Sequence, residues 1–322
     1  MRLPAALNRA IDAEAAQHDH KLLVRAVEDM SFRYRAREKN AGAFVNTPLH
    51  RAAYVVTRFP ATYAAVASVF AEVKLRMPGF EPTSVLDLGA GPGTATFAAA
   101  AIFPSLQRST LIEQDSEFIA TGRQMVKSAG SDPVARVEWI RGDLRKAEFE
   151  PHGLVVISYA LGELSEGEAL KLVGKALNSG HVLVIVEPGT PHGCGVVHVA
   201  RAAVLGAGAH IVAPCSHEGP CPMLARKGDW CHFAQRLERT SLHRQLKSGE
   251  LGYEDEKFSY MVAAKQEVTR ATARIIRHPL IGGGHIKLDL CTPSGIISET
   301  VTRSDKERFK LARRAKWGDA WE

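Results

Sequence analysis

The pattern of hydrophobic and polar residues changes near Thr83. Before that point apolar residues recur at mixed spacings of three and four, as in the stretch 49–77, and this spacing predicts helices. We expect Pro60 to break or kink the last of them, with a new helix starting near Ala61. Because no strand-like alternation occurs before Thr83, residues 1–80 are predicted to form a helical N-terminal region.

Short apolar runs alternate with helical patterns from Thr83 onwards. Apolar runs of this kind are typical of strands that are buried on both faces. Their alternation with helices predicts an α/β fold with a doubly wound parallel sheet, here assigned to residues 81–206. The expected strands lie within residues 84–93, 109–115, 135–144, 154–164 and 180–190, and the expected helices within 94–103, 116–128, 167–177 and 196–205.

The periodic pattern lapses after Gly206, where a segment rich in Pro, Gly, Cys and His begins. Within it, residues 230–246 are predicted to form a short helix. Two strands are expected to form a hairpin around Gly282–Gly284, followed by a further strand. The remaining regions are therefore a Cys-rich insertion at 207–263, a return to the Rossmann-like domain at 264–300, and a basic, helical C-terminal tail at 301–322.

The composition is that of a soluble globular protein, with 45% hydrophobic and 24% charged residues. The net charge of +6 is concentrated at the ends: residues 1–80 hold 12 Lys/Arg against 7 Asp/Glu, and residues 301–322 hold 7 against 4. The basic ends could bind a partner that carries phosphates, or they could be ordinary helix faces exposed to solvent. Charge alone does not decide between these two interpretations. With no apolar run of roughly 18 residues and no apolar signal core, we expect a cytoplasmic protein without a membrane partner.

A glycine-rich segment, 87–94, ends the first expected strand and opens a helix. Glycines let a backbone approach a ligand without a clash at Cβ. Dinucleotide sites use G-x-G-x-x-G, whereas here the third glycine comes one residue earlier and an acid precedes the first. This arrangement resembles the S-adenosylmethionine motif of class I methyltransferases, carried by Asp87, Gly89, Gly91 and Gly93.

Two acids stand at the ends of the next strands. Glu113 ends the second strand and could accept hydrogen bonds from ribose hydroxyls, and Asp143 ends the third and could accept from the adenine amino group. Taken alone, each of these acids is better explained as a helix cap or a loop residue. Together with the glycine segment they predict S-adenosylmethionine binding.

Methyl transfer is a separate question from ligand binding. The fourth strand leads into residues 158–164, which lack the Asn/Asp-Pro-Pro-aromatic turn of exocyclic-amine methyltransferases. Tyr159 is expected to line the ligand pocket. Tyr159 and Glu163 are weak candidates for a catalytic base, and each could equally be structural, so the catalytic residues are unknown.

Four of the five cysteines form a spaced set, Cys215-x5-Cys221-x9-Cys231 with Cys291 about sixty residues on. An odd cysteine count without an export signal disfavours a disulfide framework. The four thiols could converge on a metal ion or a cluster. Their spacing matches neither paired zinc knuckles nor the ferredoxin run, so unrelated cysteines stay an alternative, as does a mixed zinc site with nearby histidines.

Several further segments carry a family resemblance. Together they resemble the methyltransferase-like family of small-ribosomal-subunit proteins, which is known best from mitochondrial ribosome assembly factors and has bacterial relatives. The resemblance covers about residues 25–295. The segments are 31–35, 53–54, 57–63, 187–191, 213–215, 219–222, 229–233 and 253–260.

This resemblance implies a cofactor set and a partner. It implies a [4Fe–4S] cluster on the four spaced cysteines, with zinc as the alternative, and it leaves Cys194 outside the pattern as a packing or exposed thiol. It also implies binding to the small ribosomal subunit through 16S-type rRNA, by a protein that is monomeric away from the ribosome. The candidate phosphate contacts are Arg33, Arg35, Arg58, Lys310, Arg313, Arg314 and Lys316.

Three functions follow as alternatives. The preferred one is an S-adenosylmethionine-binding iron–sulfur protein that methylates rRNA of the small subunit, aids its assembly, or both. The second is a non-catalytic assembly factor that uses the ligand fold to bind rRNA. The third is a small-molecule methyltransferase with a zinc loop.

Overall fold

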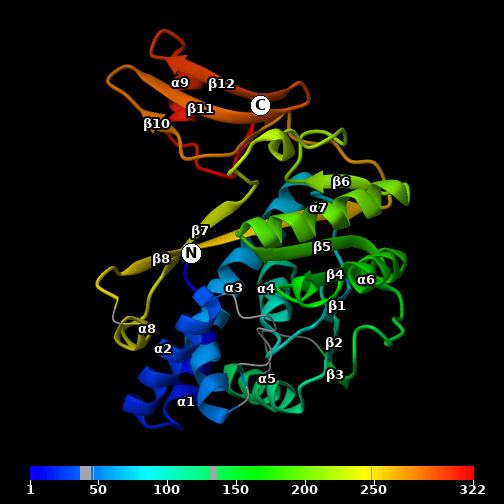
Figure 1. The fold of residues 1–322 in the computed structure, drawn as a ribbon, viewed down its shortest axis with the longest axis vertical. Coiled ribbons are helices and arrows are strands. Elements are labelled where there is room, and N and C mark those ends of the chain that lie inside the picture. Colours follow the sequence, from blue (N-terminus) through cyan, green and yellow to red (C-terminus); the bar gives the residue numbers. More distant parts are fainter. Residues whose placement is uncertain (37–44, 46, 131–135, 248) are drawn as a thin grey trace.

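The computed structural model describes every residue except 37–44, 46, 131–135 and 248, and it leaves the side chains of 34–36 undescribed. The chain begins with three helices, α1 (Ala5–Ala15), α2 (His20–Ala36) and α3 (Pro48–Arg76), drawn in blue in Figure 1. Pro48 at the start of α3 suits a position whose N–H has no helical partner, and the Thr47 side chain accepts from His50 N.

The break expected at Pro60 does not occur, because α3 runs continuously over 29 residues. An internal proline removes one backbone hydrogen bond and costs about 3 kcal/mol. Phe59 and Ala61 are fully buried on either side of it, in the core that α3 shares with α4 (Thr94–Ile102). Burial along the whole helix therefore outweighs the local preference for a break.

The main sheet has the strand order β3-β2-β1-β4-β5-β8-β6, with β7 paired to β8. Strands β1 to β5 are parallel, and β8 is antiparallel to β5, β6 and β7. The expected doubly wound α/β class is thereby confirmed. The strands are β1 (Ser84–Leu88), β2 (Arg108–Glu113), β3 (Val137–Arg141), β4 (His152–Ser158), β5 (Gly180–Pro188), β6 (His210–Ala213), β7 (Phe233–Glu238) and β8 (Tyr253–Ala264).

Helices cover both faces of this sheet, and each face has its own apolar core. One core packs α1 to α4 and α5 (Ser116–Ala129) against the sheet, while the other packs α6 (Glu166–Ser179) and α7 (Pro191–Gly206) against the opposite face. Strand β1 is buried at all five positions, as expected for a strand covered on both sides. The carboxyl ends of β1 to β5 therefore share one edge, where the glycine segment lies.

The helix expected at 230–246 is wrong for its first half. Residues 233–238 form strand β7, and only Ser241–Leu246 are helical, as α8. Phe233 and Leu237 are buried four residues apart, a spacing that fits one face of a helix and equally one face of a strand. Pairing of β7 with β8 decides between the two.

A second, smaller sheet follows the main one, drawn in orange and red in Figure 1. Its order is β10-β11-β9-β13, with β12 paired to β11. The two strands expected around Gly282–Gly284, at 271–279 and 284–293, correspond to β9 and β11, which pair antiparallel. The short strand β10, which was not expected, lies between them and forms the hairpin with β11. The strands are β9 (Ala273–Ile275), β10 (Leu280–Ile281), β11 (His285–Thr292), β12 (Gly295–Thr302) and β13 (Ala320–Trp321).

The domain boundaries expected from the sequence differ from this arrangement. Residues 207–263 supply β6, β7 and β8 to the main sheet, whereas 264–300 leave it and build most of the second sheet. The tail 301–322 contains the end of strand β12, the short helix α9 (Lys306–Ala312) and then strand β13, which pairs with β9 around Trp321. Trp321 is buried in the core of the second sheet, so the tail is part of a folded unit.

Candidate functional site

The glycine segment forms the turn between β1 and α4. Gly89, Gly91 and Gly93 all have positive φ, at 73°, 53° and 85°, a conformation that favours glycine. A Cβ at Gly89 would lie 2.6 Å from the Ala160 Cβ, so this turn also touches the segment after β4. The predicted glycine positions are therefore required by the backbone itself.

Asp87 lies beneath this turn and is fully buried. Its Oδ2 accepts from the Thr96 N–H at 3.1 Å and from the Thr96 hydroxyl at 2.8 Å. Its Oδ1 has no hydrogen-bond partner in the described part of the chain. Burial raises the pKa of Asp87 to about 7. A buried acceptor without a donor is costly, so this oxygen is fit to receive a donor from a ligand or a water molecule.

Glu113 stands at the end of β2, beside the same turn. Its Oε2 accepts from Gly91 N at 2.8 Å and its Oε1 from Asp115 N at 2.9 Å. Burial raises the pKa of Glu113 above its ordinary value. Each carboxylate oxygen can accept a second hydrogen bond, so the side chain can still bind hydroxyl donors.

Asp143 is held by a partner that the sequence did not suggest. Its carboxylate forms an ion pair with Arg145, with 2.7 Å between Arg145 Nη2 and Oδ2. Hydrogen bonds from Arg145 lower the pKa of Asp143 to about 2. An adenine amino group would have to share this carboxylate with Arg145.

Gly89, Glu113 and Asp143 line a cavity of about 380 Å³ at the carboxyl edge of the sheet, whereas Asp87, Gly91 and Gly93 lie outside its lining. Its volume falls within the range of roughly 300–1,000 Å³ common for ligand pockets. The cavity brings together most of the residues predicted for the ligand from four separate segments. It is lined by Gly89, Glu113, Gln114, Gly142, Asp143, Leu144, Arg145, Tyr159, Ala160, Glu163 and Leu164.

Tyr159 lines the cavity with an unusual backbone, at φ 57°. Its hydroxyl donates to Glu256 Oε1 at 3.0 Å. Burial raises the pKa of Tyr159 well above its ordinary value, and the charge of Glu256 adds to the shift. The phenol therefore stays protonated at neutral pH and serves as a donor to Glu256, which argues against Tyr159 as a base.

Arg58 lies on the far side of Glu256, in the interior. Its guanidinium pairs with both carboxylate oxygens of Glu256, at 2.9 and 3.2 Å, and approaches the ring of Tyr159. The prediction of Arg58 as a surface contact for RNA does not fit this half-buried position. Helix α3 turns this residue towards β8, which sequence spacing could not show.

Glu187, at the end of β5, is a site residue that the sequence analysis missed. It is buried, and its Oε1 accepts from Leu161 N at 2.9 Å and Gly162 N at 3.3 Å. Burial raises the pKa of Glu187 to about 8. The carboxylate thus supports the turn after β4 from behind. An acid that interrupts the end of an otherwise apolar strand was the available signal.

The four spaced cysteines come together between the two sheets. Cys215, Cys221 and Cys231 lie on the segments flanking β6 and β7, and Cys291 lies on β11 of the second sheet. Burial raises the pKa of Cys231 well above its ordinary value, followed by the charges of Cys215, Cys194, Cys221 and Cys291. Cys194, placed outside the set by sequence, therefore belongs to the same neighbourhood.

The arrangement of these thiols bears on which group they could hold. In the described part of the chain, no three Cys, His, Asp or Glu side chains converge as ligands of a single ion. A tetrahedral zinc site needs all its ligands within about 2.3 Å of one ion. In a cluster of four irons each thiolate binds a different iron, so the thiolates need not share one ion.

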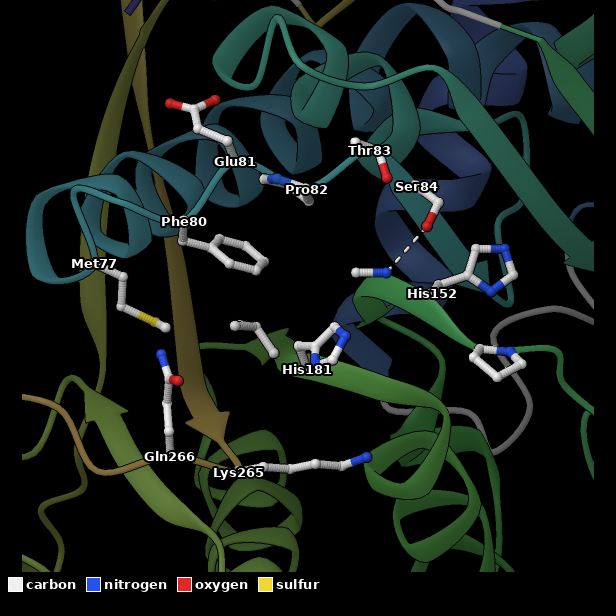
Figure 2. A pocket seen from close by; sticks show the side chains of 13 residues that line it. Met77, Phe80, Glu81, Pro82, Thr83, Ser84, His152, His181, Lys265 and Gln266 are labelled. Carbon is white, nitrogen blue, oxygen red and sulfur yellow. Dashed lines mark hydrogen bonds between the residues drawn. The ribbon is translucent and has the colours of Figure 1, made fainter.

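A larger cavity, of about 610 Å³, opens at the opposite edge of the main sheet (Figure 2). It lies at the amino ends of β1, β4 and β5, away from the glycine turn. Its most enclosed polar group, His152, already contacts Glu150 O at 2.7 Å and Thr110 Oγ1 at 3.0 Å. Among the described residues, none that lines this cavity has a buried side-chain polar atom without a hydrogen-bond partner.

Residues 48–322 match the profile of the protein family described as mitochondrial small ribosomal subunit Rsm22. The chain belongs to the Rsm22 family. The resemblance inferred from the cysteine loop and its neighbouring segments is thereby confirmed.

Among the relatives of this Rsm22-family chain is the human mitochondrial ribosome assembly protein METTL17, 28% identical over 285 residues, or 83% of this chain. A mitochondrial Rsm22-cox11 tandem protein of Schizosaccharomyces pombe is 26% identical over 320 residues. The matched regions are 61% and 42% of those two proteins. Among solved structures, a putative RNA methyltransferase of Pyrococcus horikoshii gives a TM-score of 0.42 at 14% identity, covering 62% of this chain and 81% of that one.

The cytoplasmic location expected from the sequence is contradicted by the Rsm22 relatives. The human, fission-yeast and budding-yeast proteins are all named as mitochondrial. That expectation was based on the lack of a long apolar run, which is a feature of export signals. Mitochondrial targeting segments are instead amphipathic and basic. No helix in the described part of the chain is long and apolar enough to cross a membrane.

The remaining candidates for RNA contact in this Rsm22-family chain fall into two groups. Arg33 pairs with Asp29 at 2.9 Å on α2, and the side chain of Arg35 lies outside the described residues. The C-terminal group is exposed on and after α9, and none of its members forms an ion pair with another described residue. It comprises Lys310, Arg313, Arg314 and Lys316.

Proposed function

We propose that this chain binds S-adenosylmethionine at the carboxyl edge of its main sheet and acts in assembly of the small ribosomal subunit. The observation that supports ligand binding is the glycine turn over Asp87, beside the cavity at Glu113. The buried Oδ1 of Asp87 accepts from no donor among the described residues. The names of its relatives as ribosome assembly proteins support the second part.

Each predicted ligand residue has a distinct task in this proposal. Glu113 accepts from the ribose hydroxyls, Asp143 accepts from the adenine amino group beside Arg145, and the glycine turn admits the methionine portion. Tyr159 closes the cavity on the side of β4. The ligand itself would supply a methyl group activated by its sulfonium.

The side chains near the end of β4, where a methyl acceptor would lie, favour a binding role over methyl transfer. The Tyr159 hydroxyl is committed to Glu256, and the Glu187 carboxylate is turned towards the backbone of Leu161 and Gly162. Neither group is placed to take a proton from an acceptor. Glu163, the other candidate base, does line the cavity, but residues 158–164 lack the acceptor turn of exocyclic-amine methyltransferases. We therefore propose the non-catalytic alternative, an assembly factor that binds rRNA, and treat methylation of rRNA as the outcome that would replace it.

We further propose that Cys215, Cys221, Cys231 and Cys291, the cysteine site, hold a [4Fe–4S] cluster. Their charges influence one another, and they come from both sheets. The Ser216 hydroxyl already bridges the loop to Cys291 O at 3.1 Å. A cluster here would fasten the second sheet to the first, since metal binding contributes folding free energy when its ligands come from separate segments.

For the RNA partner we propose the exposed C-terminal cations, Lys310, Arg313, Arg314 and Lys316. They lie close together along α9 and the turn after it, on the second sheet. Contacts of this kind bind phosphates without reading sequence and weaken with added salt.

The deciding experiment has two stages. Binding of S-adenosylmethionine to the anaerobically purified full chain is measured by titration calorimetry, with Glu113→Gln as the variant of the site and Glu81→Gln, at the other cavity, as the matched control. We expect binding that Glu113→Gln weakens and Glu81→Gln leaves unchanged; absence of binding by the unaltered chain would overturn the ligand proposal.

The second stage offers methyl-tritiated S-adenosylmethionine together with immature small subunits. We expect co-sedimentation of the protein with the subunits and no tritium in the rRNA. Tritium incorporation would establish a methyltransferase and overturn the non-catalytic role. Failure to co-sediment at low salt would overturn the assembly role.

A further inference from the structure

The cysteine site has a buried cation beside it, Arg201 of α7, which is 8% exposed. Its Nη2 donates to His217 O at 3.0 Å and to Gly219 O at 2.9 Å. Both carbonyls belong to the short loop between Cys215 and Cys221, so one guanidinium fixes the path of the chain between two of the proposed ligands.

A second donor of the same guanidinium group has no partner among the described residues. This donor is the Nε–H, which is buried. The guanidinium also forms no ion pair with a described carboxylate, although nearby Glu218 pairs with Arg270 instead. An unpaired buried charge is strongly destabilising, so this position calls for an anion.

Arg274 is a second buried arginine in this region, and its charge and donors have partners within the protein. It is 1% exposed, pairs with Glu72 at 2.7 Å, and donates to Pro214 O and Gly318 O. Arg274 thus has its counter-ion within the protein. Among the described residues, the printed partners of Arg201 are two neutral carbonyls.

The loop that Arg201 holds is itself tied to the second sheet. Ser216, the residue after Cys215, donates its hydroxyl to Cys291 O on β11 at 3.1 Å. Arg201 therefore fixes a loop that connects proposed ligands from both sheets. The loop that it holds lies between the main sheet and the second sheet in Figure 1.

We propose that Arg201 is a positioning residue of the cysteine site: it fixes the loop between Cys215 and Cys221, balances the negative charge of a bound iron–sulfur cluster, and donates its Nε–H to a sulfur of that site. This inference rests on the proposed [4Fe–4S] cluster. Hydrogen bonds to sulfur and local charge set the reduction potential of such clusters, and groups behind metal ligands typically contribute about 10- to 100-fold in metal affinity.

The test uses the full chain with its cluster, kept under argon, and compares three variants. Arg201→Met removes the charge and the donors, and Arg226→Met is the matched control. Arg201→Lys keeps the charge but loses the planar guanidinium group with its Nε–H and its fixed fork of donors. Arg226 lies in the same segment, is about half exposed, and pairs with Asp229 at 3.7 Å. Two quantities are measured: the rate at which EDTA removes iron, and the midpoint potential in a titration with dithionite.

For Arg201→Met we expect iron loss about 10- to 100-fold faster and a midpoint potential shifted to more negative values, because reduction adds negative charge that the arginine no longer offsets. Arg201→Lys should restore most of the potential while still losing iron faster. A purely structural role would leave the potential in place, and equal behaviour of Arg201→Met and Arg226→Met in both measurements would overturn the inference.

Two further outcomes are distinguishable. If the unaltered chain holds no iron or sulfide, the proposed cluster fails, and the role of Arg201 falls with it. If circular dichroism shows that Arg201→Met does not fold, the test uses Arg201→Lys in its place. An iron-loss rate for Arg201→Lys equal to that of the unaltered chain would then overturn the inference.

Discussion

The glycine turn offers the sharpest quantitative prediction, because two of its glycines differ in surroundings. Gly89 and Gly91 both have positive φ, at 73° and 53°. A Cβ at Gly89 would meet Ala160 Cβ at 2.6 Å and Leu144 at 3.3 Å, whereas a Cβ at Gly91 would meet nothing within 4 Å. Replacing each by alanine therefore separates backbone strain from steric overlap.

The expected magnitudes follow from these contacts. An L-residue in the left-handed region costs about 1–2 kcal/mol, and this cost applies to both variants. Gly89→Ala adds overpacking of about 1–3 kcal/mol. Alanine also lowers the entropy of the unfolded chain, by an amount worth about 0.4–1 kcal/mol, but this effect is common to both and cancels in their difference.

The free energies of unfolding are measured by urea denaturation of the full chain without ligand. We expect Gly89→Ala to be less stable than Gly91→Ala by about 1–3 kcal/mol. Gly89→Ala should also weaken S-adenosylmethionine binding more, because Ala160 and Leu144 line the cavity. Equal destabilisation by the two substitutions would refute the claim that Gly89 is required for its close approach to the segment after β4.

Three other predictions can be tested on the same protein. Asp87 has a pKa of about 7 in the folded protein, above its ordinary 3.8, so its contribution to stability is present below about pH 4 and is lost as the pH rises through 7. Between pH 5 and pH 8 the urea midpoint of the unaltered chain should therefore fall more than that of Asp87→Asn, and parallel curves for the two proteins would contradict this. Tyr159→Phe removes the hydrogen bond to Glu256 and should lower the free energy of unfolding by about 1.5–3 kcal/mol, as checked by thermal unfolding, whereas no loss would show that the bond is not formed. Alanine at Lys310, Arg313, Arg314 and Lys316 should weaken binding to small-subunit RNA and flatten its salt dependence by about one unit of slope per lost phosphate contact, while an unchanged slope in filter binding would move the RNA surface elsewhere.

The local sequence was sufficient to predict a structural feature wherever the residue types in a short segment allow few conformations. The glycine spacing at 89, 91 and 93 predicted a turn because few other residues adopt positive φ. The continuous apolar runs of β1, β4 and β5 predicted buried parallel strands, since only strands covered on both faces lack polar positions. The acids Glu113 and Asp143 followed from strand order, because parallel strands present their carboxyl ends at one edge.

Other features depended on contacts between segments distant in sequence. Pro60 stays helical because its neighbours are buried on both sides, and β7 is a strand because β8 is there to pair with it. Arg58 looked like a surface cation until α3 turned it towards Glu256, 198 residues away. The same holds for Asp143, whose pairing with Arg145 was not apparent from strand order.

The sequence by itself determined the fold class, the glycine turn and the family to which the cysteine loop belongs, because each depends on residue type at short spacing. Only the tertiary structure decided that residues after 264 leave the main sheet for a second one, so that Cys291 comes from a different sheet than the loop cysteines. Only it decided that Arg201 is buried against their loop, with no counter-ion among the described residues. Such features arise from the balance of burial and charge between distant segments, and no local pattern records that balance.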